Sequence, residues 1–175
     1  MNTNVLQELS RHTGLRGLYV QGKSKVTAEM LEVLPSLAQL HTLNIDSNLL
    51  TGQIWPLVGK LPELRVLNFY TNSQLTCEGL GELRSCPQLW SLILIGTQVA
   101  DADLEPLGDL PELNDLRLSS TSISNAGLVH LERCHELRIV DLRKTNVTAA
   151  GVAKLQQALS SCLITWDAQA AAALK

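Results

Sequence analysis

"LNDLRLSSTSISNAGLVHLERCHE" occupies Leu113–Glu136, and the stretch that follows it, "LRIVDLRKTNVTAAGVAKLQQALS" at Leu137–Ser160, repeats its apolar pattern almost position for position. A fixed period of about 24 residues indicates a solenoid, in which each unit buries its apolar face on its neighbours. The pattern extends backward through four further units with nearly the same spacing. The six unit starts are Leu15, Leu40, Leu64, Leu89, Leu113 and Leu137.

Each unit changes its apolar period halfway. Its first half reads LxxLxL, as at Leu113, Leu116 and Leu118, and this period of two predicts a short strand with one buried face. The second half places apolar residues at helical spacing, as at Leu128 and Leu131. A hydroxyl residue precedes this half in five units, where we expect it to cap a short helix. These residues are Thr27, Thr51, Thr76, Ser124 and Thr148.

A strand, a covering helix and a parallel strand cannot close a core within a single unit of this length, so the units must stack into one long parallel sheet. The period and the pattern LxxLxLxxTxVTxxGLxxL resemble leucine-rich repeats. The subtype that the pattern resembles is the cysteine-containing-like one of bacterial tandem-repeat proteins, found in related form beside F-box domains. The resemblance implies an α/β fold, a right-handed solenoid with a curved parallel β-sheet on its concave face and short helices on its convex face. The second unit, with "LTGQIW" from Leu50, resembles the plant-type repeat, and we expect a 3₁₀ or irregular segment there.

The chain is interpreted as one leucine-rich repeat domain over residues 1–175. Six repeats occupy 15–160, and residues 1–14, with Leu6 and Leu9 at half-repeat positions, are expected to form an N-terminal cap. Residues 161–175 are expected to hold a capping strand, with Ile164 and Trp166 directed inward, followed by an alanine-rich tail.

The composition is that of a globular protein with an aliphatic core, since Leu supplies 35 of 175 positions and aromatic residues only 3%. No apolar run approaches the roughly 20 residues that a membrane span requires, and the first residues lack the pattern of a secretory signal. We therefore expect a cytoplasmic protein with no membrane association, while a secreted effector stays open.

The four cysteines are interpreted as core residues. Cys86 and Cys134 share a column with leucines of other units, and they lie two repeats apart, too far for a disulfide. His130 and His135 flank Cys134 without completing a four-ligand zinc set. The chain also lacks a nucleophile elbow, a phosphate-binding glycine loop and an HExxH motif. We therefore predict no enzymatic activity, no metal, no cofactor and no small-molecule substrate.

The outward positions of the strands hold the candidate site. In the fourth repeat, Trp90, Ile93 and Ile95 are assigned outward, next to Tyr70 of the third repeat. Adjacent exposed apolar residues flanked by arginines have the composition of an interface hot spot. The candidate partner-binding residues are Arg65, Tyr70, Trp90, Ile93, Ile95, Arg117 and Arg143.

Charge favours the same face. The nine residues after each unit start carry a net charge of +4, against −7 for the rest of the chain. This favours a protein or peptide partner with an acidic patch, whereas a pI near 5.8 argues against nucleic acid. The main hypothesis is a protein-protein interaction module that binds on its concave sheet face. The alternative is a substrate-recognition part of a larger assembly, such as a ubiquitin-ligase adaptor or a secreted bacterial effector.

Overall fold

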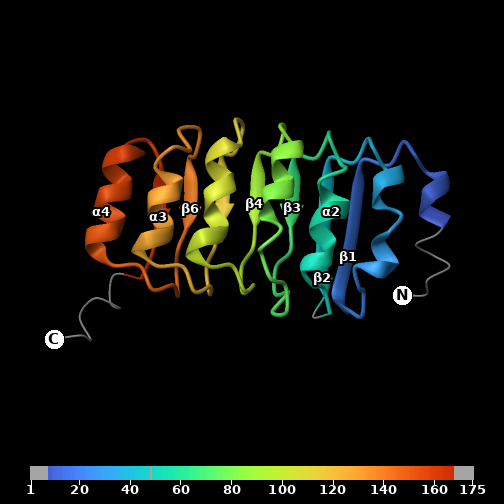
Figure 1. Ribbon diagram of the computed structural model, residues 1–175, viewed down its shortest axis with the longest axis horizontal. Helices are drawn as coiled ribbons and strands as arrows, with labels where there is room; N and C mark the ends of the chain where they lie inside the picture. Colours follow the sequence, from blue (N-terminus) through green and yellow to red (C-terminus); the bar gives the residue numbers. More distant parts are fainter. Residues whose placement is uncertain (1–7, 48, 168–175) are drawn as a thin grey trace.

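The computed structural model describes residues 8–47 and 49–167. Its seven strands form one sheet, in which each strand lies parallel to the next and the order follows the sequence (Figure 1). The strands are β1 (Gly17–Ser24), β2 (Thr42–Ser47), β3 (Val66–Asn68), β4 (Ser91–Ile93), β5 (Asp115–Arg117), β6 (Ile139–Asp141) and β7 (Leu163–Thr165). Each unit therefore pairs only with its neighbours along the chain, as in a solenoid.

The LxxLxL positions stack in register. Leu67 of β3 pairs with Leu92 of β4, which in turn pairs with Leu116 of β5. Along β2, half-buried and buried residues alternate, as a strand with one covered face requires. The core is a continuous column of buried aliphatic side chains, with the rings of Trp55 and Phe69 packed 5.6 Å apart in its N-terminal half.

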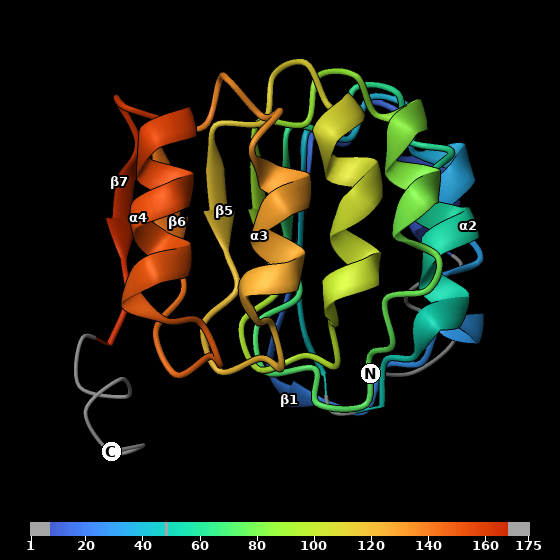
Figure 2. The ribbon, with the colours of Figure 1, turned by 60° about the vertical axis from the view of Figure 1, so that its left-hand side comes forward.

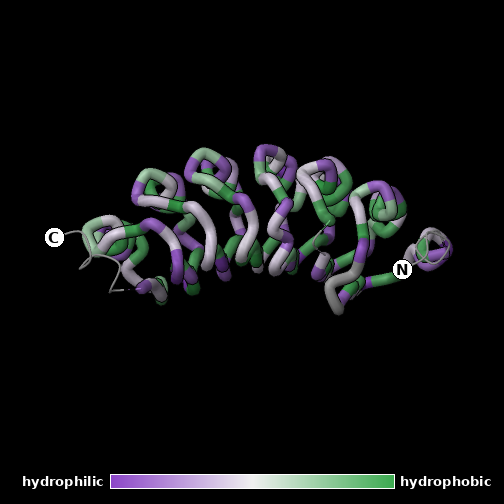
Figure 3. The backbone as a smooth tube through the Cα atoms, turned by 90° about the horizontal axis from the view of Figure 1, so that it is seen from below, coloured by the Kyte–Doolittle hydropathy of each residue, from purple (hydrophilic) through white to green (hydrophobic). Residues whose placement is uncertain are grey.

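Short helical segments cover the other side of the sheet (Figure 2). Seen along its edge, the molecule is an arch, with the strands on the inner side and the helical segments on the outer side (Figure 3). The segments are η1 (Leu9–Arg11), η2 (Glu29–Leu31), η3 (Leu34–Ser36), η4 (Gly52–Ile54), α2 (Trp55–Val58), η5 (Leu80–Ser85), η6 (Asp101–Asp109), α3 (Asn125–Leu131) and α4 (Ala149–Ala158).

The expected short helices are present, and most of them are 3₁₀ helices. Among the described residues of the six units, α-helix occurs only in the second, fifth and sixth. Proline disfavours an α-helix in one of the 3₁₀ segments, because Pro106 lies inside η6, where the ring would clash with the carbonyl four positions earlier in an α-helix. In the second unit, the expected 3₁₀ segment is present as η4 and continues into α2, whose Pro56 sits in the first turn, where a missing N–H costs little.

The expected helix caps form only in part. The hydroxyls of Ser124 and Thr148 accept backbone N–H groups at the starts of α3 and α4. Thr51 flanks η4 without a side-chain bond. The expectation is wrong for Thr27 and Thr76, because Ala28 precedes η2 and Gly79 precedes η5.

Both ends of the described chain add to the stack. Strand β7 pairs with β6, and Ile164 and Trp166 pack against the core as partly buried residues. Leu9 of η1 does the same at the other end, whereas Leu6 and the tail at 168–175 lie outside the described residues. None of the helices in the described part of the chain has the length and apolar character needed to span a bilayer.

Candidate interaction surface on the concave face

The inner side of the arch is built from the residues that alternate with the buried leucines, and we call it the strand face. Each unit from the second to the sixth contributes three side chains to it, whereas the first unit has Gly17 at the first of the three positions. Over the central four strands these are Val66, Asn68 and Tyr70; Ser91, Ile93 and Ile95; Asp115, Arg117 and Ser119; and Ile139, Asp141 and Arg143. The first member of each set was missed from the sequence, although it lies two positions after the unit start and has the same period of two.

An apolar strip occupies the middle of the strand face. Ile93 and Ile95 of the fourth unit are half-buried, and Tyr70 is 47% exposed. Ile93 pairs in register with Asn68 on one side and with Arg117 on the other. The carbonyl of Ile95 accepts the N–H of Thr71, which places Tyr70 beside Ile95. The structure thus brings Tyr70, Ile93 and Ile95 onto one patch next to Arg117.

Two arginines beside this strip are held by carboxylates of their own strands. Arg117 donates to Asp115, with Nε 3.0 Å from Oδ1 and Nη2 3.1 Å from Oδ2. Arg143 donates to Asp141 in the same way, with Nε 2.9 Å from Oδ1 and Nη2 2.8 Å from Oδ2. The carboxylate side chains are 7% and 6% exposed, whereas those of Arg117 and Arg143 are 43% and 60% exposed. Each guanidinium is therefore fixed at one edge and open to solvent at the other.

The four groups form one electrostatic unit. Arg117 and Asp141 are register partners across β5 and β6. Bonds from Arg143 lower the pKa of Asp141 from 3.8 to about 2, and the bond to Asp115 raises the pKa of Arg117. Two positive and two negative charges cancel here. The net charge of +4 counted from the sequence already includes both aspartates, so that surplus comes from the other charged residues after the unit starts and not from this part of the face.

Arg65 and Trp90 lie apart from this strip, at the edge where loops lead into the strands. Trp90 is 47% exposed and directly precedes β4, and its carbonyl accepts the N–H groups of both Asn114 and Asp115. Both residues line an open cavity of about 580 Å³, which we call the edge groove. The edge groove is formed by Arg65, Pro87, Gln88, Trp90, Pro111 and Glu112. The candidate residues therefore divide into a strand-face group and an edge pair.

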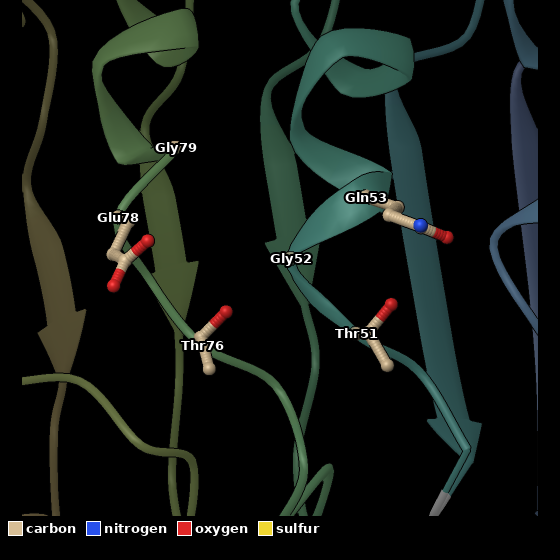
Figure 4. Close-up of a pocket in the computed structure, with 6 residues that line it drawn as sticks. All are labelled: Thr51, Gly52, Gln53, Thr76, Glu78 and Gly79. Carbon is tan, nitrogen blue, oxygen red and sulfur yellow. The ribbon is translucent and has the colours of Figure 1, made fainter.

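A second hollow of about 650 Å³ lies where loops lead into the convex segments, between Thr51 and Thr76 (Figure 4). It was not identified from the sequence. A Cβ on Gly52 would lie 2.6 Å from the Thr76 hydroxyl, and one on Gly79 would lie 2.7 Å from the Trp55 ring. The Trp55 indole in turn donates to the Thr76 carbonyl at 2.8 Å. Neighbouring units thus pack too closely at these two positions for a larger side chain, which accounts for both glycines.

The four cysteines are buried, free thiols. Cys86 and Cys134 donate to the carbonyls of Val58 and Leu107, each at 3.5 Å. Burial raises the pKa of Cys86 to about 11 and that of Cys134 to about 12, so both stay protonated at neutral pH. Over residues 8–47 and 49–167, no group of three His, Cys, Asp or Glu side chains is placed to hold a metal ion.

Known structures with the same architecture are leucine-rich repeat proteins. The crystal structure of an internalin C2 from Listeria monocytogenes is 23% identical, with a TM-score of 0.68 over 91% of this chain and 64% of that one. A leucine-rich repeat protein from Leptospira interrogans is 17% identical, with a TM-score of 0.55 over 91% of this chain and 50% of the other. No protein-family model matches the sequence, and no curated protein matches it. The fold is a leucine-rich repeat solenoid, and the chain spans less than two thirds of either neighbour.

Proposed function

We propose that this leucine-rich repeat solenoid is a protein-interaction module, which binds a protein or peptide partner across its strand face. The observation that carries the proposal is the apolar strip of Tyr70, Ile93 and Ile95 on the inner side of the arch, beside the exposed guanidinium of Arg117. Tyrosine and arginine are among the residues that most often dominate binding energy, and neighbouring apolar contacts exclude water from them.

The fixed arginines favour this use. A guanidinium that already lies in one orientation loses less conformational entropy when a partner binds to it. Asp115 and Asp141 supply that fixation for Arg117 and Arg143, and the remaining N–H groups stay accessible. The strand face therefore offers an apolar anchor site together with preformed hydrogen-bond donors.

The strand face favours a partner with apolar anchors and hydrogen-bond acceptors over one with a dense acidic patch. A carboxylate of the partner would compete with Asp115 and Asp141 for guanidinium groups whose charge is already balanced. The proposal includes a non-enzymatic role and a cytoplasmic location, which the four free buried thiols support.

The test compares partner capture by three immobilised proteins. The wild-type chain and Ile93→Ser/Ile95→Ser are exposed to a lysate of the source cells, alongside Val129→Ser, which removes an exposed apolar side chain from the convex helix α3. Partners that wild type and Val129→Ser retain should bind the double variant at least about 30-fold more weakly, since hot-spot losses reach about 2 kcal/mol or more. A double variant that keeps the wild-type circular dichroism spectrum and every partner would refute the proposal.

A further inference from the structure

We propose that the edge groove is a second recognition site, separate from the strand face, and that it takes a lysine or arginine side chain of a partner polypeptide. None of the groove residues belongs to the strand-face strip of Tyr70, Ile93 and Ile95. The inference therefore goes beyond the proposed function and does not depend on it.

Neighbouring units are linked by a recurring pairing of residues along this edge. In this pattern, the residue that directly precedes a unit start contacts a residue of the preceding unit. That second residue directly follows the start of its own unit. Gln88 thus accepts two bonds from Arg65, at 3.2 Å from Nε and 3.0 Å from Nη2. In the next but one unit, Asn114 donates to the carbonyl of Glu136 at 2.9 Å.

Glu112 occupies the position between these two contacts, and there the pattern is broken. In this pattern the contact partner of Glu112 is Trp90 of the fourth unit. At the position of Trp90, the neighbouring units have an arginine or an asparagine. Among the residues that the structure describes, the carboxylate of Glu112 has no hydrogen bond or ion pair. The groove thus holds an unpaired negative charge next to an exposed indole ring.

Arg65 also lines the groove but forms no ion pair with Glu112, because its guanidinium donates to Gln88 instead. Gln88 donates through Nε2 to Glu63 at 3.0 Å, which fixes the amide so that its oxygen faces Arg65. Glu63, Gln88 and Arg65 are therefore linked by hydrogen bonds, and Gln88 and Arg65 line one side of the groove. On the other side of the groove, the Trp90 ring and the Glu112 carboxylate are the groups that an occupant would contact.

A basic side chain satisfies both groups. The face of a tryptophan ring attracts a cation more strongly than any other aromatic side chain, and a lysine or arginine head over Trp90 can also pair with Glu112. The apolar stem of such a side chain packs against proline surfaces, which Pro87 and Pro111 provide. A purely apolar occupant would leave the carboxylate desolvated and unpaired, and an acidic one would be repelled by it.

The experiment selects peptides from a random dodecapeptide phage library on the wild-type protein and retests them on variants. Peptides that lose binding to Trp90→Ala should carry a lysine or arginine. Their synthetic forms should bind about fivefold more weakly to Glu112→Gln and about tenfold more weakly when citrulline or norleucine replaces the basic residue. The matched control is Glu78→Gln, which removes an exposed carboxylate at the other hollow and should leave binding unchanged.

Three results would overturn the assignment. The first is a set of Trp90-dependent peptides that are acidic or lack a basic residue, and the second is unchanged binding to Glu112→Gln. The third is a library that yields no Trp90-dependent peptide. The Ile93→Ser/Ile95→Ser variant should bind the selected peptides as wild type does. If it loses them, the peptides belong to the strand face, which supports the proposed function and contradicts this second site.

Discussion

At the scale of single residues, the pair of Asp141 and Arg143 makes the strand face sensitive to acid. Because the folded-state pKa of Asp141 lies at about 2, below its ordinary 3.8, the pair stabilises the fold above that ordinary value and loses its effect as the pH falls toward 2. Asp141→Asn should lower the free energy of unfolding by about 1 kcal/mol at pH 7, since solvent around the exposed guanidinium screens the pair.

Urea unfolding of wild type and Asp141→Asn at several pH values measures this effect. The difference between the two proteins should be constant from pH 5 to 7 and should shrink between pH 4 and 2. Glu78→Gln, at an exposed carboxylate, is the control and should show no such change. A difference that does not depend on pH would contradict the assigned ion pair.

A left-handed backbone position recurs in four consecutive units, at Thr71, Gly96, Ser120 and Lys144, with φ between 55° and 69°. Only glycine adopts this conformation without steric cost. Gly96→Ala should therefore destabilise the fold by about 1 kcal/mol, and Ser120→Gly should stabilise it by about 0.5 kcal/mol after the entropy gained by the unfolded chain. Denaturant midpoints of the two variants provide the test, and shifts of the same sign would contradict it.

A sequence pattern for the held arginines exists, although the sequence analysis did not use it. Asp-Leu-Arg occurs at 115–117 and again at 141–143. Residues two apart on a strand project from the same face, so each carboxylate lies within reach of its arginine. Arg117 and Arg143 are assigned outward from the sequence, whereas the position of Asp115 is not among the outward columns. The net charge of +4 includes Asp115 and Asp141, but it does not show that these two carboxylates hold Arg117 and Arg143 and so leave the surplus to the other basic residues.

At the scale of elements, the caps of the last two helices also join neighbouring units. Ser124 donates its hydroxyl to Asp101 of the preceding unit at 2.5 Å, and its N–H donates to the same carboxylate at 2.7 Å. The side-chain amide of Asn125 donates to the hydroxyl of Thr148 at 2.8 Å, and the backbone N–H of Thr148 donates to the amide oxygen of Asn125 at 2.9 Å. These bonds tie the start of each helix to the neighbouring unit.

Ser124→Ala should lower the free energy of unfolding by about 1–2 kcal/mol, because it removes both the cap and one bond to Asp101. Thr27→Ala is the matched control, since Thr27 occupies the same column without a side-chain bond, and it should change stability by less than about 0.5 kcal/mol. Equal losses in the two variants, measured by urea unfolding, would show that the cap of α3 adds nothing.

Outside the second unit, where a 3₁₀ or irregular segment is expected, the helix type of the convex segments could not be predicted from the sequence. Over segments this short, the periods of the 3₁₀ helix and the α-helix place apolar side chains on nearly the same face. The choice between them depends on proline position and on the room between neighbouring units. Pro106 within η6 and the capped start of α3 illustrate the two outcomes.

At the scale of the whole molecule, the sequence period predicts the strand order, since a stacked unit can pair only with its neighbours. Stacking of the units also predicts that the inward leucines form one column, as they do. The period does not predict that Arg65 and Trp90 lie apart from the candidate residues on the strand face. Trp90 precedes β4 and lies in the edge groove, because the alternation of side chains begins only within the strand.

The cancelled charges of the strand face predict a weak salt dependence of binding there. Between 50 and 500 mM NaCl, the Kd of a partner captured through Ile93 and Ile95 should change by less than about threefold, since no net charge on this part of the face attracts the partner over a distance. Isothermal titration at the two salt concentrations measures it. A loss of affinity of a hundredfold or more would show that free charges govern the interaction.

The central claim is that Ile93 and Ile95 project from the inner side of the arch while Leu92 and Leu94 fill the core. Single cysteine substitutions at these four positions test it directly, because the four native thiols are buried and give little background reaction with Ellman's reagent at pH 8. The thiols of Ile93→Cys and Ile95→Cys should react in the native protein, and those of Leu92→Cys and Leu94→Cys only after unfolding. The opposite alternation, or equal reactivity at all four positions, would contradict the strand face and the recognition built on it.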